Sequence, residues 1–73
     1  MDEGAAVRTA NAIVRRLVED GWAETKGRGS HRNFRHPAKP GKVTVPFHGN
    51  RDLPIGTIRS LERQTGLDLL PKR

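Results

Sequence analysis

Residues 22–47 read WAETKGRGSHRNFRHPAKPGKVTVPF. This stretch decides the fold, because short runs with β-strand character alternate in it with turn-forming glycines and prolines. We expect three strands, at 22–26, 30–36 and 42–47. Gly27, Arg28 and Gly29 mark the first turn, and Pro-Ala-Lys-Pro-Gly-Lys at 37–42 is expected to be a loop because it cannot sustain a hydrogen-bonded ladder. Residues 22–47 therefore predict a small antiparallel sheet.

Alternation in the second strand predicts which side chains share a face. Phe34 is the expected inward anchor, with Arg32 and His36 on its side. The side chains expected to face solvent are His31, Asn33 and Arg35. We expect Trp22 and Phe34 to belong to the core rather than to stack on bases, and His36 to be a structural residue at the strand end. In the third strand, Val43, Val45 and Phe47 share one side.

Helical patterns flank the sheet. Apolar residues recur three and four positions apart in Thr9–Asp20 and again in 54–65, which predicts one amphipathic helix on each side. Gly21 and Gly66 follow the two helices as left-handed closing residues. The order helix, strand, strand, strand, helix predicts an α+β fold class, a small α-β-β-β-α domain. We expect one domain over 1–73, with a frayed start at 1–8 and a C-terminal tail at 68–73.

Composition limits the class of protein. Seventy-three residues with three aromatic side chains and no cysteine suit one thin-cored domain without disulfides. No apolar run approaches the roughly 20 residues that cross a bilayer. The acidic start Met1-Asp2-Glu3 lacks the pattern of a signal peptide. We therefore expect a cytoplasmic protein without a membrane partner.

The net charge of +6 is concentrated in the middle of the chain. Residues 22–51 hold seven lysines and arginines and a single acid, Glu24. A local excess of this kind is typical of a nucleic-acid-binding surface. An acidic protein or an anionic lipid would also satisfy it, but the segment contains no amphipathic helix to lie on a membrane.

Several kinds of site are disfavoured by the residues present. His31 and His36 differ by five positions and point to opposite faces of a strand, which is poor geometry for a metal. Gly27 and Gly29 form only Gly-x-Gly, without a phosphate-binding Lys-Ser/Thr pair. Ser30 has no orienting acid that would make it a nucleophile. We expect neither a metal nor another cofactor.

Acid–base chemistry on RNA fits the central segment better. RNA carries its own nucleophile, the 2′-hydroxyl, so an enzyme needs only a proton-transferring group and cations at the phosphate. His31 is the candidate catalytic group. The candidate RNA-binding residues are Lys26, Arg28, Gly29, Ser30, Arg32, Arg35 and Lys42. For the whole chain, the alternatives are a non-catalytic RNA-binding module and a domain whose basic face docks an acidic protein. For the residues around His31 alone, the alternative is a basic turn in which His31 is an ordinary surface residue.

The order and spacing of several short motifs resemble those of the HicA-type mRNA interferase toxins of bacterial toxin–antitoxin systems. The resemblance covers about 9–67. Its pieces are Asp20-Gly21-Trp22, Gly29-Ser30-His31-Arg32, Arg35-His36-Pro37, Val43-Thr44-Val45-Pro46 and His48-Gly49-Asn50-Arg51-Asp52-Leu53-Pro54, followed by Gly56-Thr57-Ile58-Arg59-Ser60 and Arg63-Gln64-Thr65-Gly66-Leu67.

The resemblance implies a fold like that of double-stranded-RNA-binding domains. It also implies ribonuclease activity on an mRNA substrate, translation arrest, and neutralisation by a cognate HicB-type antitoxin. The catalytic histidine of the family's Gly-Ser-His motif corresponds to His31. Ile55 departs from the family pattern, which often has a lysine there, and Glu62 stands where an apolar residue is common. We therefore expect the second helix to be less basic and to expose a different face.

Overall fold

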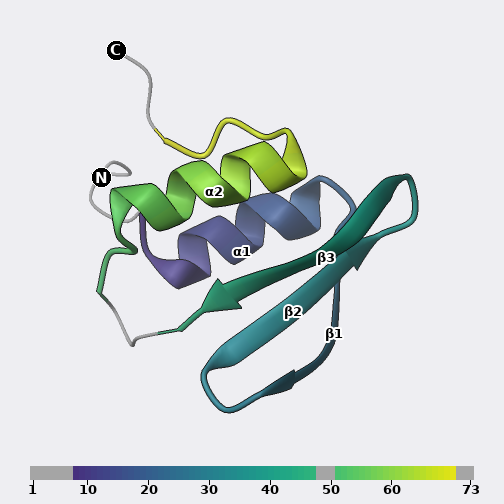
Figure 1. Ribbon diagram of the computed structural model, residues 1–73, viewed down its shortest axis with the longest axis horizontal. Coiled ribbons are helices and arrows are strands. Elements are labelled where there is room, and N and C mark those ends of the chain that lie inside the picture. Colours follow the sequence, from purple (N-terminus) through teal and green to yellow (C-terminus); the bar gives the residue numbers. More distant parts are fainter. Residues whose placement is uncertain (1–7, 48–50, 71–73) are drawn as a thin grey trace.

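The structure, a computed structural model, describes residues 8–47 and 51–70. Its elements are α1 (Ala10–Glu19), β1 (Ala23–Arg28), β2 (His31–His36), β3 (Lys39–Pro46) and α2 (Ile55–Thr65) (Figure 1). This order confirms the predicted α-β-β-β-α domain of the α+β class, and it is consistent with the likeness to double-stranded-RNA-binding domains. His48, most of the expected frayed start and the end of the expected tail lie outside the described residues.

Helix α1 begins and ends as its sequence predicts. The Thr9 side chain caps the first turn by accepting a hydrogen bond from the Ala12 amide at 3.2 Å. At the other end Gly21 takes a φ of 109°, and the amides of Gly21 and Trp22 donate to the carbonyls of Val18 and Leu17. This pair of bonds is a Schellman motif, which closes a helix by satisfying its last carbonyls. It also turns the chain so that Trp22 enters the core.

Helix α2 ends at a left-handed glycine, as predicted, and holds the following segment. Gly66 has a φ of 77° and donates its amide to the Glu62 carbonyl at 2.8 Å. The Glu62 carboxylate accepts from the amides of Leu69 and Leu70 at 2.8 and 3.3 Å. The departure from the family pattern at Glu62 therefore has a structural role, because its side chain anchors the chain that buries Leu69.

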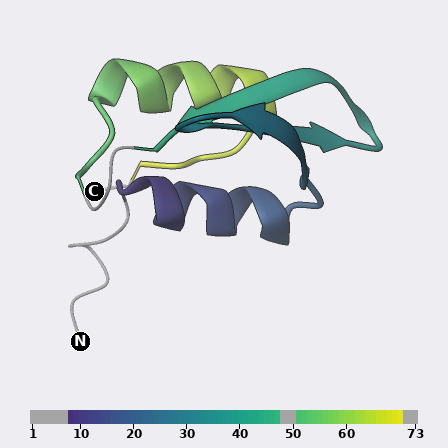
Figure 2. The ribbon, with the colours of Figure 1, turned by 90° about the horizontal axis from the view of Figure 1, so that it is seen from below.

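The three strands form one antiparallel sheet in the order β1-β2-β3. The two helices run in the same direction and share one hydrophobic core with the sheet. The segment after α2 passes on the side of the helices away from the sheet (Figure 1) and runs between them in the view of Figure 2. The sheet contributes Phe34, Val43 and Val45 to this core, all at most 1% exposed. Both helices therefore cover the face of the sheet that carries Phe34, and the opposite face is open.

The structure corrects two turn predictions. The first turn is Gly29-Ser30, and Gly27 and Arg28 belong to β1 instead. Of the predicted loop 37–42, residues 37–38 do form a turn, but 39–42 were wrongly predicted, because β3 already starts at Lys39. In the register, His36 pairs with Lys39 and Arg35 with Lys42, so Pro40 and Gly41 have no partner on β2. Pro40 lacks an amide hydrogen, but because it has no partner on β2, no hydrogen bond between β2 and β3 is lost. The hairpin therefore continues past it.

A polar cluster explains why the β2–β3 hairpin extends so far. Lys39 Nζ donates at 2.7 Å both to Asp20 Oδ2 and to the Thr65 carbonyl, which joins the ends of both helices to the hairpin. His36 Nε2 lies 2.7 Å from the Asp20 carbonyl, and His36 Nδ1 accepts from the Ala38 amide at 2.9 Å. The ring also meets Trp22 edge-on, with centroids 5.3 Å apart. His36 is thus the structural strand-end residue that its position predicts.

In the part of the chain that the structure describes, neither helix is long and apolar enough to cross a membrane.

Candidate functional site

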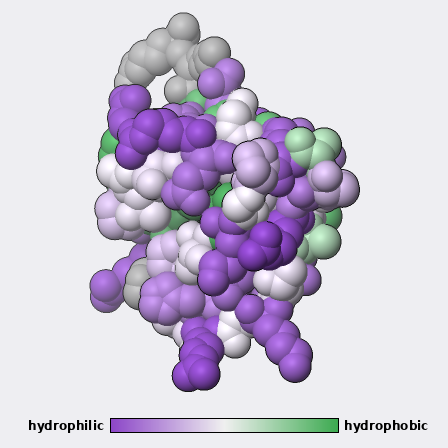
Figure 3. All heavy atoms as spheres, turned by 45° about the vertical axis from the view of Figure 1, so that its right-hand side comes forward, coloured by the Kyte–Doolittle hydropathy of each residue, from purple (hydrophilic) through white to green (hydrophobic). Residues whose placement is uncertain are grey.

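The open face of the sheet carries the side chains that the sequence predicted to face solvent. The register sets out three rows across the strands. From one end of β2 to the other, the rows are Arg28–His31–Pro46, Thr25–Asn33–Thr44 and Ala23–Arg35–Lys42. Hydrophilic side chains project from the lower side of the molecule in Figure 3, where the sheet lies in Figure 1. Apart from Ala23 and Pro46, the side chains of these rows are polar or basic.

His31 stands at one end of this face, directly after the Gly29-Ser30 turn. Its side chain is exposed and makes no hydrogen bond within the described residues, whereas its backbone is held on both sides. Arg28 is its partner on β1 and Pro46 its partner on β3. The neighbouring Ser30 carbonyl accepts from the Phe47 amide at 2.7 Å. The imidazole is therefore free to meet a ligand, on a backbone that cannot shift easily.

A β-bulge in β1 supports the backbone beside His31. Thr25 pairs with Asn33 and Arg28 with His31, so Lys26 and Gly27 together face the single residue between these partners. Gly27 packs so tightly against the His31 carbonyl oxygen that a Cβ there would overlap it. The bulge requires a glycine at this position because the two backbones approach each other closely. From the sequence, Gly27 was predicted to belong to a turn.

Asn33 joins all three strands on the open face and was not among the predicted site residues. Its Nδ2 donates to the Lys26 carbonyl in the bulge at 2.8 Å, and its Oδ1 accepts from the Thr44 hydroxyl at 2.6 Å. The alternation of β2, which places Asn33 on the side of His31, was the available signal. Asn33 fixes the bulge that in turn contacts the backbone of His31.

Arg32 lies on the other side of β2 from His31. Its Nε and one terminal nitrogen donate to the two carboxylate oxygens of Glu24 at 2.7 and 2.5 Å, in the paired geometry that arginine makes with a carboxylate. Its guanidinium carbon lies 4.4 Å from the centre of the Phe47 ring. The hydrogen bond and charge of Arg32 lower the pKa of Glu24, and those of Glu24 raise the pKa of Arg32. Arg32 thus covers the edge of the core.

The remaining predicted RNA-binding residues are all exposed. Arg35 and Lys42 share the open face with His31, and Arg28 stands beside it. Lys26 belongs to the bulge, and Gly29, with a φ of 55°, and Ser30 form the turn. Of the three arginines around the motif, Arg28 and Arg35 are therefore on the histidine side, and Arg32 is not.

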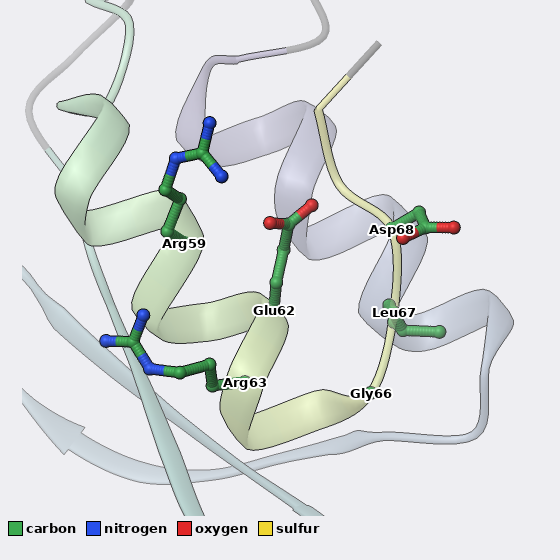
Figure 4. A pocket seen from close by; sticks show the side chains of 6 residues that line it. All are labelled: Arg59, Glu62, Arg63, Gly66, Leu67 and Asp68. Atoms are coloured by element: carbon green, nitrogen blue, oxygen red, sulfur yellow. The ribbon is translucent and has the colours of Figure 1, made fainter. Parts of the chain in front are cut away.

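A shallow hollow lies elsewhere, between α2 and the segment that follows it (Figure 4). None of the residues predicted as a site lines it; its lining residues are Arg59, Glu62, Arg63, Gly66, Leu67 and Asp68. Among residues 8–47 and 51–70, no group of three or more histidine, aspartate or glutamate side chains is arranged to hold a metal ion. The open sheet face, and not the hollow, gathers the predicted side chains.

Residues 10–67 match the model of a family described as the HicA toxin of bacterial toxin–antitoxin systems. No curated protein matches the chain. The matched range runs from the first residue of α1 to just beyond α2, so it includes every strand of the open face.

Proposed function

The chain belongs to the HicA toxin family of bacterial toxin–antitoxin systems, and on this premise we propose that it is an endoribonuclease that cleaves mRNA and arrests translation. His31 is the proton-transferring group, and the reaction needs no metal. The observation that carries the proposal is the position of His31: an exposed imidazole on a firmly held backbone, at the end of a basic and otherwise open sheet face.

The reaction follows from the chemistry of RNA. The 2′-oxygen attacks the adjacent phosphorus, the bond to the 5′-oxygen of the next nucleotide breaks, and a 2′,3′-cyclic phosphate forms. A proton leaves the 2′-hydroxyl and another reaches the departing 5′-oxygen, and His31 is suited to one of these transfers because imidazole exchanges protons near neutral pH. Arg28, the cross-strand partner of His31, supplies positive charge for the phosphate.

Among the predicted RNA-binding residues, four exposed cations support the proposal most. Lys26, Arg28, Arg35 and Lys42 are exposed, and within the described residues none of their side chains forms an ion pair. Arg32 is engaged by Glu24, so we propose that it acts on RNA only through the packing of the sheet edge.

A toxin of this family has an antitoxin partner. We propose a HicB-type antitoxin whose acidic surface covers His31 or blocks RNA from reaching it, because charge complementarity favours an acidic partner for the basic open face. Burial of this face would also stabilise the thin-cored domain by mass action.

The test of the proposed activity is the variant His31→Ala. The wild-type chain should arrest growth when expressed, and the purified chain should cleave mRNA in the presence of EDTA. Loss of an acid–base group typically lowers the rate by about 10²–10⁴. The variant should therefore be non-toxic, yet unfold at the wild-type temperature and still bind RNA. Near wild-type cleavage by the variant would remove His31 from the mechanism, and binding without cleavage by the wild type would favour a non-catalytic RNA-binding module.

A further inference from the structure

Arg35 and Lys42 stand directly opposite each other on β2 and β3, on the open face of the sheet. Both side chains are exposed. Within the described residues neither donates to a carboxylate or to a backbone carbonyl. By contrast, Arg32 is held by Glu24, Lys39 by Asp20 and Arg16 by the Asp68 carbonyl. The pair therefore holds two adjacent positive charges, and neither has an anionic partner among the described residues.

This arrangement costs the fold stability. Like charges directly opposite each other on neighbouring strands destabilise a sheet, whereas opposite charges in the same place stabilise it. An acidic residue in either position would relieve the repulsion without disturbing any hydrogen bond. The pair is explained if an anion occupies the site when the protein acts.

The pair lies on the same face as His31 and in line with it. Arg35 stands four positions after His31 on β2, which is about 13 Å along a strand. Between them is the row of Asn33 and Thr44, whose side chains are bound to each other and leave the surface flat and polar. No helix covers this path, because both helices pack on the face of Phe34.

We propose that Arg35 and Lys42 form a phosphate subsite that holds a single-stranded RNA along β2, so that one phosphate lies between the two cations while another lies at His31. This inference rests on the proposed ribonuclease function and names the substrate class of that site. An open antiparallel sheet suits a single strand, because single-stranded RNA can lie along an exposed sheet, whereas duplex RNA is recognised by its shape across the minor groove. With no phenylalanine, tyrosine or tryptophan in the three rows, the face binds the backbone rather than stacked bases.

The binding test uses the full chain with His31→Ala, so that the RNA is not cut. A single-stranded RNA oligonucleotide and the same strand annealed to its complement are compared by fluorescence anisotropy. The double variant Arg35→Gln with Lys42→Gln should bind the single strand ~10-fold more weakly, and its salt dependence should become shallower by about 0.7 in log–log slope, since the pair holds one phosphate and each phosphate on a single strand contributes about 0.7.

The matched control is Arg59→Gln with Arg63→Gln, which removes the same charge from the exposed surface of α2. Its affinity for the single strand should change less than about twofold. Equal losses in the two double variants, or preferential binding of the duplex, would overturn the subsite and indicate that RNA lies on the helical side or binds through net charge alone.

A cleavage test in the chain with His31 intact separates this inference from the proposed function. A dinucleotide has one phosphate and cannot reach both His31 and the pair, so the Arg35–Lys42 double variant should cut it at the wild-type rate while cutting a longer strand more slowly. Equal slowing on both substrates would overturn the subsite. If the wild type cuts neither substrate, the proposed ribonuclease activity fails, and the binding test alone decides whether the phosphate subsite exists.

The melting temperature distinguishes a role of Arg35 in RNA binding from a role in the stability of the fold. Arg35→Glu places an acid opposite Lys42, so it should raise the melting temperature while weakening RNA binding. A variant that lost both stability and binding would show that Arg35 supports the fold, and the proposal would be wrong.

Discussion

The α-carbon of Gly27 lies against the carbonyl oxygen of His31, with no room between them for a methyl group. This contact closes the bulge of β1 onto the strand that presents His31. The position of the candidate catalytic residue therefore depends on the absence of a side chain four residues earlier.

Gly27→Ala should destabilise the domain and impair cleavage more than RNA binding. The new methyl group must displace either the bulge or the His31 backbone, and overpacking of this kind costs about 1–3 kcal/mol. Urea unfolding measures the loss. Gly56→Ala is the control, because a Cβ there meets nothing within 4 Å in α2 and alanine favours a helix. Indistinguishable unfolding curves for the two variants would show that the bulge relaxes freely.

Asn33→Asp should weaken the bulge while keeping the contact to β3. An aspartate can still accept from the Thr44 hydroxyl, but it cannot donate to the Lys26 carbonyl. We expect a loss of about 1 kcal/mol in the free energy of unfolding, the usual net value of one hydrogen bond. Hydrogen exchange at the β1 amides should be faster in the variant than in the wild type. Equal protection of these amides in the two proteins would contradict the prediction.

Gly21→Ala should be more destabilising than Gly41→Ala. Both glycines have a positive φ, of 109° and 84°, so both substitutions introduce backbone strain of about 1–2 kcal/mol. Only at Gly21 does the added Cβ also approach a side chain, at 2.8 Å from His36 Nε2, whereas at Gly41 nothing lies within 4 Å. Thermal melting of the two variants tests the order, and a larger loss at Gly41 would reverse the interpretation.

The domain should lose stability in acid through Asp20 and Glu24. The Lys39 ammonium lowers the pKa of Asp20 below its ordinary value of 3.8, and Arg32 lowers the pKa of Glu24 below 4.5. A carboxyl group with a lowered folded pKa stabilises the protein above its unfolded pKa, and this contribution is lost as the pH falls through the folded pKa. The melting temperature should therefore decline below about pH 4.5.

Asp20→Asn isolates one part of this acid response. The variant should be less stable than the wild type at pH 7, and this difference in stability should narrow as the pH falls below 3.8, because the carboxyl group of the unfolded wild type is protonated first and that of the folded protein follows at its lower pKa. Glu19 is exposed on α1 and has no ion-pair partner among the described residues. The control variant Glu19→Gln should therefore leave the pH dependence of the stability unchanged. If the difference in stability between Asp20→Asn and the wild type stayed constant across this pH range, the effect of Asp20 would come from packing rather than from charge.

The sequence predicted the helices well because their signals are local. Apolar spacing and the glycines at 21 and 66 are enough to place α1 and α2, and alternation was enough to assign Phe34 to the core and His31 to the surface. These features depend on residues a few positions apart.

The errors arose where distant residues decide the structure. The hairpin reaches Lys39 because Asp20 and the Thr65 carbonyl hold its side chain, and neither partner is near it in the sequence. In the same way, charge alone grouped Arg32 with Arg35, and only the pairing of β1 with β2 brings Glu24 to Arg32. Composition counts the cations of a segment, but the register of the sheet decides which of them have partners.

The opposite orientation of His31 and Phe34 on one strand also bears on how such a gene decays. A substitution at His31 would remove the proposed activity without touching the core, so a mutated copy would still fold and still present the open face that we propose the antitoxin covers. Such a copy would act as a decoy that withdraws antitoxin from an intact toxin in the same cell. Inactivating this domain by a point mutation is therefore not equivalent, for the cell, to deleting its gene.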